Sequence, residues 1–185
     1  MSENAEASQT LEDMGLLHDN IAAAVRARFG SRLATVAEYD PVDAHSKTIK
    51  TPAVLLELVE IRPAGRATGG RTAVELAWSA HCVLSAATTN VQREVRNFAA
   101  QVLRLVDGNR WDLGESVGRP DDLEAFPGAF KPGDKGFESW IVNWKQTAHL
   151  GASWELPDDG PAVDVFVGEF PHVGAEHQGS YREVT

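Results

Sequence analysis

The sequence predicts an α+β domain: a mixed, mainly antiparallel sheet with a long hairpin, flanked by two helices. Two segments repeat apolar residues with the spacing of amphipathic helices. Residues 73–84 and 138–151 alternate between apolar and polar positions, as half-buried strands do. A Gly-rich loop, and not a helix, joins residues 53–61 to 73–84, which indicates an antiparallel pair.

The first helix is expected to begin near Thr10 and Asp13, which resemble a capping pair. Its apolar residues recur at every fourth position: Leu17, Ile21, Val25 and Phe29. Gly30 follows directly and suits the position after a helix end. These features predict one amphipathic helix ending at Phe29.

Residues 32–41 predict a short strand, and the polar residues 42–51 predict a loop. After Pro52, residues 53–61 form a nearly continuous apolar run, typical of a central strand covered on both faces. Residues 62–71 contain glycines and three arginines, and we expect them to close a long hairpin. The run 53–61 is therefore expected to be the deepest strand.

The strand predicted at 73–84 places Cys82 among its inward residues. Cys82 is the only cysteine, so the chain forms no internal disulfide, and the pattern favours a small core residue over a nucleophile. A second helix is expected from Thr89, which would form a capping box with Gln92, to Gly108. The following Gly-, Pro- and Asp-rich stretch predicts mostly surface loop, with a short strand near residues 115–119.

The segment "ESWIVNWKQTAHLG", residues 138–151, predicts a strand with Trp140 and Trp144 facing inward. The same alternation places Gln146 inward, without a catalytic partner nearby in the sequence. We expect Gln146 to bond a neighbouring backbone or to lie at a contact between subunits.

Charge and composition exclude several classes of function. The 185-residue chain has a net charge of −10, and seven acidic residues but only Arg182 follow Gly151. A broad basic face for specific binding of duplex DNA is therefore not expected. The sequence also lacks an apolar stretch long enough to span a membrane and a secretory signal, which predicts a protein made and kept in the cytoplasm.

No motif for catalysis, a cofactor or a metal is apparent. "GRATGG" lacks the Gly-Lys-Ser/Thr ending of a phosphate-binding loop, and the six histidines show no spacing of a metal pair. Glu57 and Glu60 are an odd number of residues apart, which would place them on opposite faces of a strand. The sequence therefore predicts a protein that is not an enzyme.

The order of features resembles the tail terminator, or tail completion, proteins of long-tailed bacteriophages. The resemblance rests on an N-terminal helix, "PAV" opening an apolar strand, a long hairpin, a helix closing with "LVDGNRW", and a late strand "WIVNWKQT". It covers roughly residues 11–151. We therefore expect a tail-terminator-like domain at 11–151, preceded by a flexible N-terminus at 1–10 and followed by an acidic extension at 152–185 that the resemblance does not cover.

The resemblance implies a structural virion protein without catalysis or cofactors. Six copies would form a ring on the tail tube protein, stop tube growth and provide the surface that joins the head-tail connector protein. The genomic DNA would pass through the ring without specific binding, and the protein would lie at the head-proximal end of the tail after assembly in the host cytoplasm. We expect these residues at its interfaces: Arg62, Arg66, Arg71, Gln146, Phe166 and Phe170.

Two alternatives remain open from the sequence. The first is a head-tail connector or another ring protein of the tail tube. The second is a monomeric domain that binds a small molecule near Trp78, Trp140 and Trp144, although aromatic residues at strand spacing more often form a core. The acidic extension has too few apolar residues to order itself, so we expect it to dock on a neighbouring subunit or ring.

Overall fold

The computed structural model describes residues 10–40, 49–65, 68–128, 136–152, 154, 166–167 and 169–183. The chain divides into two units, Met1–Ser153 and Trp154–Thr185. This division lies close to the boundary expected at residues 151 and 152. No described helix is long and apolar enough to cross a membrane.

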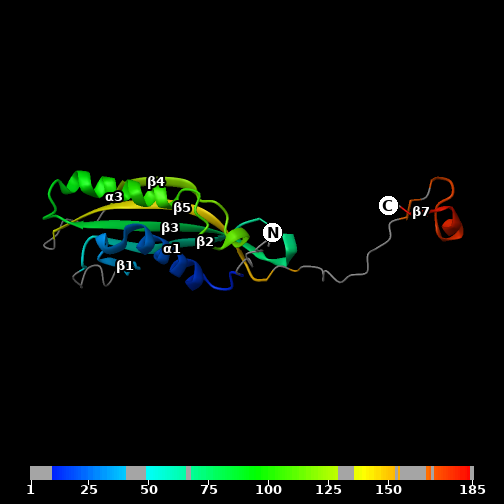
Figure 1. The fold of residues 1–185 in the computed structure, drawn as a ribbon, viewed down its shortest axis with the longest axis horizontal. Helices are drawn as coiled ribbons and strands as arrows, with labels where there is room; N and C mark the ends of the chain where they lie inside the picture. Colours follow the sequence, from blue (N-terminus) through cyan, green and yellow to red (C-terminus); the bar gives the residue numbers. More distant parts are fainter. Residues whose placement is uncertain are drawn as a thin grey trace, which may run out of the picture. The chain divides into compact units, whose positions relative to one another are not determined.

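The first unit is a five-stranded sheet with two helices on one face (Figure 1). The strand order is β1-β2-β3-β5-β4; β1 pairs with β2 in parallel and the other pairs are antiparallel. The strands are β1 Thr35–Glu38, β2 Ala53–Pro63, β3 Thr72–Ser85, β4 Asp121–Pro127 and β5 Phe137–Leu150. The helices are α1 Met14–Phe29 and α3 Val91–Val106, with short 3-10 turns at Gly30–Arg32, Thr68–Gly70 and Gly114–Ser116. The predicted α+β fold class is confirmed.

Helix α1 begins and ends where the sequence predicts. Asp13 is its N-cap and accepts a hydrogen bond from the backbone N–H of Leu16 at 3.0 Å. Gly30 follows the helix with a φ of 56°, a conformation that favours glycine. The side chains that recur every fourth position are all buried against the sheet.

Helix α3 has the predicted apolar stripe but not the predicted cap. Its N-cap is Asn90, in the left-handed conformation with a φ of 54° and without a side-chain capping bond. The expected capping box of Thr89 and Gln92 is therefore wrong. Asn tolerates this conformation better than most residues, so the turn before the helix selects Asn90 by its backbone geometry.

β3, not β2, is the central strand. β1 pairs only with Ala53–Leu56 of β2, and the second half of β2 is exposed. The run 53–61 is therefore not the deepest strand, because only its first four residues are buried. In β3, by contrast, nearly every residue from Ala73 to Leu84 is buried, and Cys82 is fully buried as expected. Burial also raises the pKa of the Cys82 thiol, which suits an inert core residue.

β4 was missed by the sequence analysis, which expected surface loop there. The strand "DDLEAFP" pairs with β5 at the edge of the sheet, with a bulge between Asp121 and Glu124. The short strand expected near residues 115–119 is a 3-10 turn followed by a single bridge from Val117 to Ala148. Charged residues, a bulge and flanking prolines are common on edge strands, where they discourage pairing with other chains.

The second unit has local structure of its own. The two-residue strands β6 Phe166–Val167 and β7 Arg182–Glu183 pair in antiparallel fashion, and a 3-10 segment covers Ala175–Ser180. The backbone N–H of Gly174 donates to the hydroxyl of Tyr181 at 2.7 Å. From its composition the extension was expected not to order itself; its described residues nevertheless form this local structure, which backbone pairing and the bond to Tyr181 hold together.

Candidate functional site

Gln146 is buried, with 1% of its surface exposed, and lies at the centre of a network of four hydrogen bonds. Its Oε1 accepts from the indole N–H of Trp111 at 2.8 Å and from that of Trp144 at 3.4 Å. Its Nε2 donates to the backbone carbonyls of Asn109 at 2.9 Å and Gly118 at 2.7 Å. Gln146 therefore bonds neighbouring backbone, one of the two expected outcomes, and is removed from the candidate interface.

The tryptophans considered for a ligand pocket belong to the core. Trp78 and Trp144 stack with ring centroids 6.2 Å apart, and both rings are buried. Trp111 packs on Trp144 at the same centroid distance. Trp140 is half-buried and packs against this cluster. The rings of Trp78, Trp111 and Trp144 are therefore core residues, and only Trp140 keeps part of its surface accessible.

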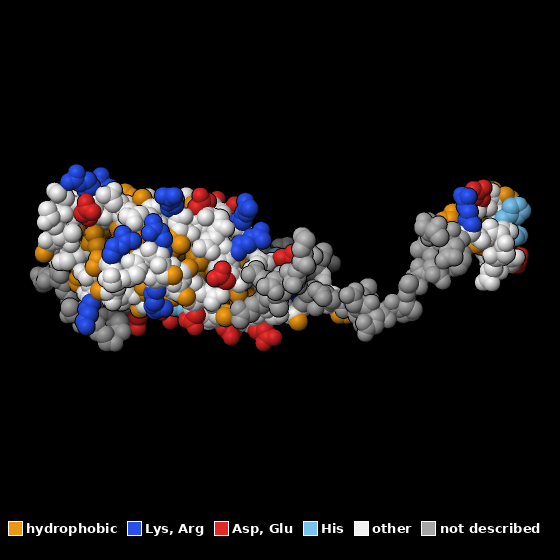
Figure 2. Space-filling view, viewed as in Figure 1, with side chains coloured by type: hydrophobic (Ala, Val, Ile, Leu, Met, Phe, Trp, Pro, Cys, Tyr) orange, Lys and Arg blue, Asp and Glu red, His pale blue; other side chains and the backbone are white. Residues whose placement is uncertain are grey.

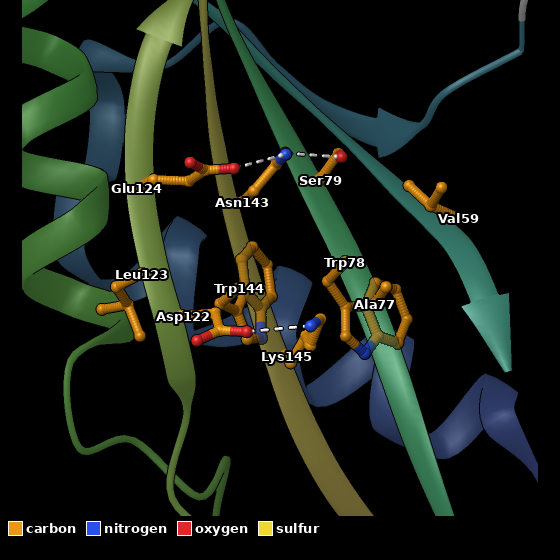
Figure 3. Close-up of a pocket in the computed structure, with 10 residues that line it drawn as sticks. All are labelled: Val59, Ala77, Trp78, Ser79, Asp122, Leu123, Glu124, Asn143, Trp144 and Lys145. Atoms are coloured by element: carbon orange, nitrogen blue, oxygen red, sulfur yellow. Dashed lines mark hydrogen bonds and ion pairs between the residues drawn. The ribbon is translucent and has the colours of Figure 1, made fainter. Parts of the chain in front are cut away.

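The sheet face opposite the helices carries a shallow hollow of about 420 Å³ (Figure 3). Ser79 donates to Asn143 at 2.8 Å, and Asn143 donates to Glu124 at 3.4 Å. Lys145 and Asp122 form an ion pair at 2.8 Å, which raises the pKa of Lys145. Because these polar side chains already bond one another, a small ligand in the hollow would have to compete with these bonds.

A bulge in β2 brings Glu57 and Glu60 to the same sheet face. The register shifts between Leu58 and Glu60, so that Glu57 faces Ser79 and Glu60 faces Ala77. The expectation that the two carboxylates lie on opposite faces is therefore wrong, because it assumed an uninterrupted alternation. Each carboxylate has its own partner, so the two do not form an acid/base pair.

The partner of Glu57 is His81, at 2.9 Å between Oε2 and Nε2. The ring of Tyr39 stacks on His81 with centroids 4.3 Å apart. These contacts connect the end of β1 to β2 and β3, so the three side chains contribute to the structure of the sheet. Among the residues that the structure describes, no three His, Cys, Asp or Glu side chains are placed to hold a metal ion.

Residues 62–71, which contain Arg62, Arg66 and Arg71, connect β2 to β3, and we name them the arginine loop. Arg62 forms an ion pair with Glu60 at 2.7 Å, and this bond raises the pKa of Arg62. Arg71 is half-buried, and its Nε has no hydrogen-bond partner among the described residues. Arg66 lies outside the described residues. The described part of this loop thus holds one paired and one incompletely paired guanidinium.

Beyond Leu56, the outer edge of β2 has no strand partner in the described part of the chain, and we call this stretch the open edge. No described strand pairs with it from Glu57 to Pro63, because β1 ends at Glu38. Val59 and Ile61 in this stretch are 57% and 52% exposed. An open strand edge with apolar side chains is a common site of contact with another chain.

The second unit also exposes apolar side chains. Phe170 is 91% exposed, and Val167 and Val173 are exposed beside it in sequence. The backbone of Phe166 pairs with Glu183 in the small hairpin, and its side chain lies outside what the structure describes. The sequence analysis selected both phenylalanines as interface candidates and did not single out Val173.

The chain matches no known family model. No curated protein gives a significant match either. Function must therefore be inferred from the surfaces of this chain.

Proposed function

We propose that the chain is the subunit of a ring on the end of a bacteriophage tail tube. The ring, of six copies, stops tube polymerisation and provides the surface that joins the head. The observation that carries this proposal is the open edge of β2 from Glu57 to Pro63 with exposed Val59 and Ile61. A subunit contact at this edge would bury apolar surface that the monomer leaves in water.

The distribution of charge supports passage of DNA through such a ring. In the described part of the sheet, the strand register places five carboxylates on the helix-free face, and Asp122 bonds Lys145 on the same face, against two cations, Arg62 and Lys145. The carboxylates belong to Glu57, Glu60, Glu75, Asp121 and Glu124. An acidic face toward the lumen would repel phosphates and let genomic DNA slide without specific binding.

The proposed partners are further copies of the chain, the tail tube protein and the head-tail connector protein. In the virion the protein would lie at the head-proximal end of the tail, after assembly in the host cytoplasm. It would act as a structural protein, not as an enzyme. A head-tail connector or another tube-associated ring protein is the second candidate, because the open β2 edge suits any ring assembly.

Native mass spectrometry and negative-stain imaging of the purified chain test the proposal. We expect a hexamer, or rings that form when tail tubes are added, and tubes capped at one end. A monomer at all concentrations, with or without tubes, would contradict the proposal. A monomer whose melting temperature rises with a small ligand would instead support the binding-domain alternative.

The arginine loop provides a second test. Replacing Arg62, Arg66 and Arg71 by serine should leave the monomer folded, because Arg62 is exposed and its ion pair contributes little to stability. Docking to an acidic partner surface should weaken, since three cations are lost. Because salt screens such attraction, wild-type docking should weaken with ionic strength and approach that of the variant. Tube binding can be measured by co-sedimentation; equal binding of both proteins at every ionic strength would show that the loop is only solvated.

A further inference from the structure

The C-terminal unit is too small to bury its own apolar side chains. It begins at Trp154, and the chain has no disulfide to stabilise it. Units below about 40 residues usually need a disulfide, a metal or a partner chain. Among its described residues, Trp154, Val167, Phe170 and Val173 expose apolar side chains that a partner would cover.

The charge of the C-terminal unit indicates the kind of surface that would cover it. Seven acidic residues follow Gly151, against Arg182 alone. Arg182 lies 3.8 Å from Glu169, so the remaining carboxylates have no basic residue of their own unit to pair with. A partner surface should therefore carry several cations together with some apolar area.

The outer face of α3 carries such cations. Arg93, Arg96 and Arg104 are exposed; at 100° per residue Arg93 and Arg104 fall on the side of α3 opposite its buried stripe, and Arg96 lies on the adjoining flank. We name these three residues the arginine stripe. Lys and Arg side chains are visible over the helix layer in the space-filling view (Figure 2).

The arginine stripe is not neutralised within the described part of the chain. None of its three guanidinium groups lies in a described ion pair, and Arg96 donates only to the carbonyl of Gln92, at 2.7 Å. By contrast, Arg62 and Lys145 are paired with Glu60 and Asp122. The stripe therefore remains available to carboxylates from another chain, and its arginine stems can cover apolar side chains.

We propose that the C-terminal unit of one copy docks on the arginine stripe of a second copy. Its carboxylates would pair with the guanidinium groups, and Phe170 would pack against the stems of the arginines. One unit and one stripe per chain give a head-to-tail contact, which closes into a ring when the rotation permits. The inference deepens the proposed function by assigning one contact of the ring.

The length of the connection favours a second copy over the same chain. β5 has 14 residues, about 46 Å at 3.3 Å per residue. α3 begins beside the start of β5, whereas the connection leaves from the end of β5. The connecting residues 151–165 span at most about 54 Å when fully extended. Reaching Arg93 of the same chain would therefore use most of this length, whereas docking on a second copy sets no such limit.

Complementation between two full-length variants tests the inference. R93Q/R96Q/R104Q removes the stripe and keeps the C-terminal unit, whereas F170S/V173S alters the unit and keeps the stripe. In sedimentation velocity at low salt, each variant alone should associate at least about tenfold more weakly than wild type. An equimolar mixture should form a 1:1 complex, because each supplies what the other lacks. K50Q/R110Q/R119Q, which removes the same charge elsewhere, should associate as wild type does, and circular dichroism checks that all variants are folded.

Several results would overturn the inference. They are wild-type association by the stripe variant, equal loss in the control variant, and a mixture that stays uncomplexed. Concentration-independent protection of the C-terminal unit from hydrogen exchange would place it on its own chain. A stripe variant that loses only nucleic-acid binding would assign the stripe to DNA or RNA. If the stripe variant still forms rings on tubes, the proposed function stands and this contact is wrong. If the two variants form a 1:1 complex but no rings form on tubes, this contact stands and the proposed function is wrong.

Discussion

Gln146→Leu is expected to destabilise the first unit by about 3–5 kcal/mol, although leucine matches glutamine closely in size. The change removes four hydrogen bonds at once: two accepted by Oε1 and two donated by Nε2. It leaves the buried indole N–H groups of Trp111 and Trp144 without partners, and it removes a partner from the half-buried carbonyls of Asn109 and Gly118. Each unsatisfied buried group costs about 1–3 kcal/mol, which exceeds the gain from a more apolar side chain. Urea unfolding followed by tryptophan fluorescence gives the free energy of unfolding.

Asn143→Leu is the matched control for this substitution. It makes the same kind of change in the same strand, and Asn143 also bonds two side chains, Ser79 and Glu124. Asn143 lies on the helix-free face, where water can replace the lost bonds, so the cost should stay below about 1 kcal/mol. Equal effects of the two substitutions would show that the bonds of Gln146 add nothing to the stability of the core.

Trp144→Ala should also destabilise the fold, by roughly 3–5 kcal/mol, because it opens a large cavity. The ring is 1% exposed and packs between Trp78 and Trp111. For a unit of this size, such a loss should lower the melting temperature by roughly 10 °C. Trp154→Ala is the control, since that ring is 72% exposed and should leave the melting temperature unchanged. A Trp144→Ala variant that melts like wild type but loses assembly would place Trp144 at an interface.

The sequence predicted the elements whose apolar spacing dominates. α1, β3 and β5 agree with prediction to within a few residues because a single buried face determines the pattern of each. β4 was not predicted, because an edge strand with exposed acidic residues and flanking prolines resembles a loop in sequence. The depth of β2 was overestimated because an apolar run does not show how much of it a neighbouring strand covers.

The candidate site was less predictable because it depends on pairings between distant segments. The inward direction of Gln146 followed from alternation, but its partners Trp111 and Gly118 come from another part of the chain. The sheet face on which Glu60 lies depends on one bulge, which no local sequence pattern indicates. The unpaired edge of β2 depends on where β1 ends. The three arginines of α3 matter only in combination with an acidic C-terminal unit whose only Lys or Arg is Arg182.

The bulge in β2 has a consequence for the length of this strand. Val59 is the extra residue, since Leu58 pairs with Trp78 and Glu60 with Ala77, its neighbour in β3. A chain lacking Val59 would keep Leu58 and Ile61 toward the helices and Glu60 on the other side, because simple alternation gives the same facing. Loss of one residue elsewhere in β2 would turn the following residues over. Val59 therefore marks the position where related proteins can differ by one residue without rebuilding the sheet.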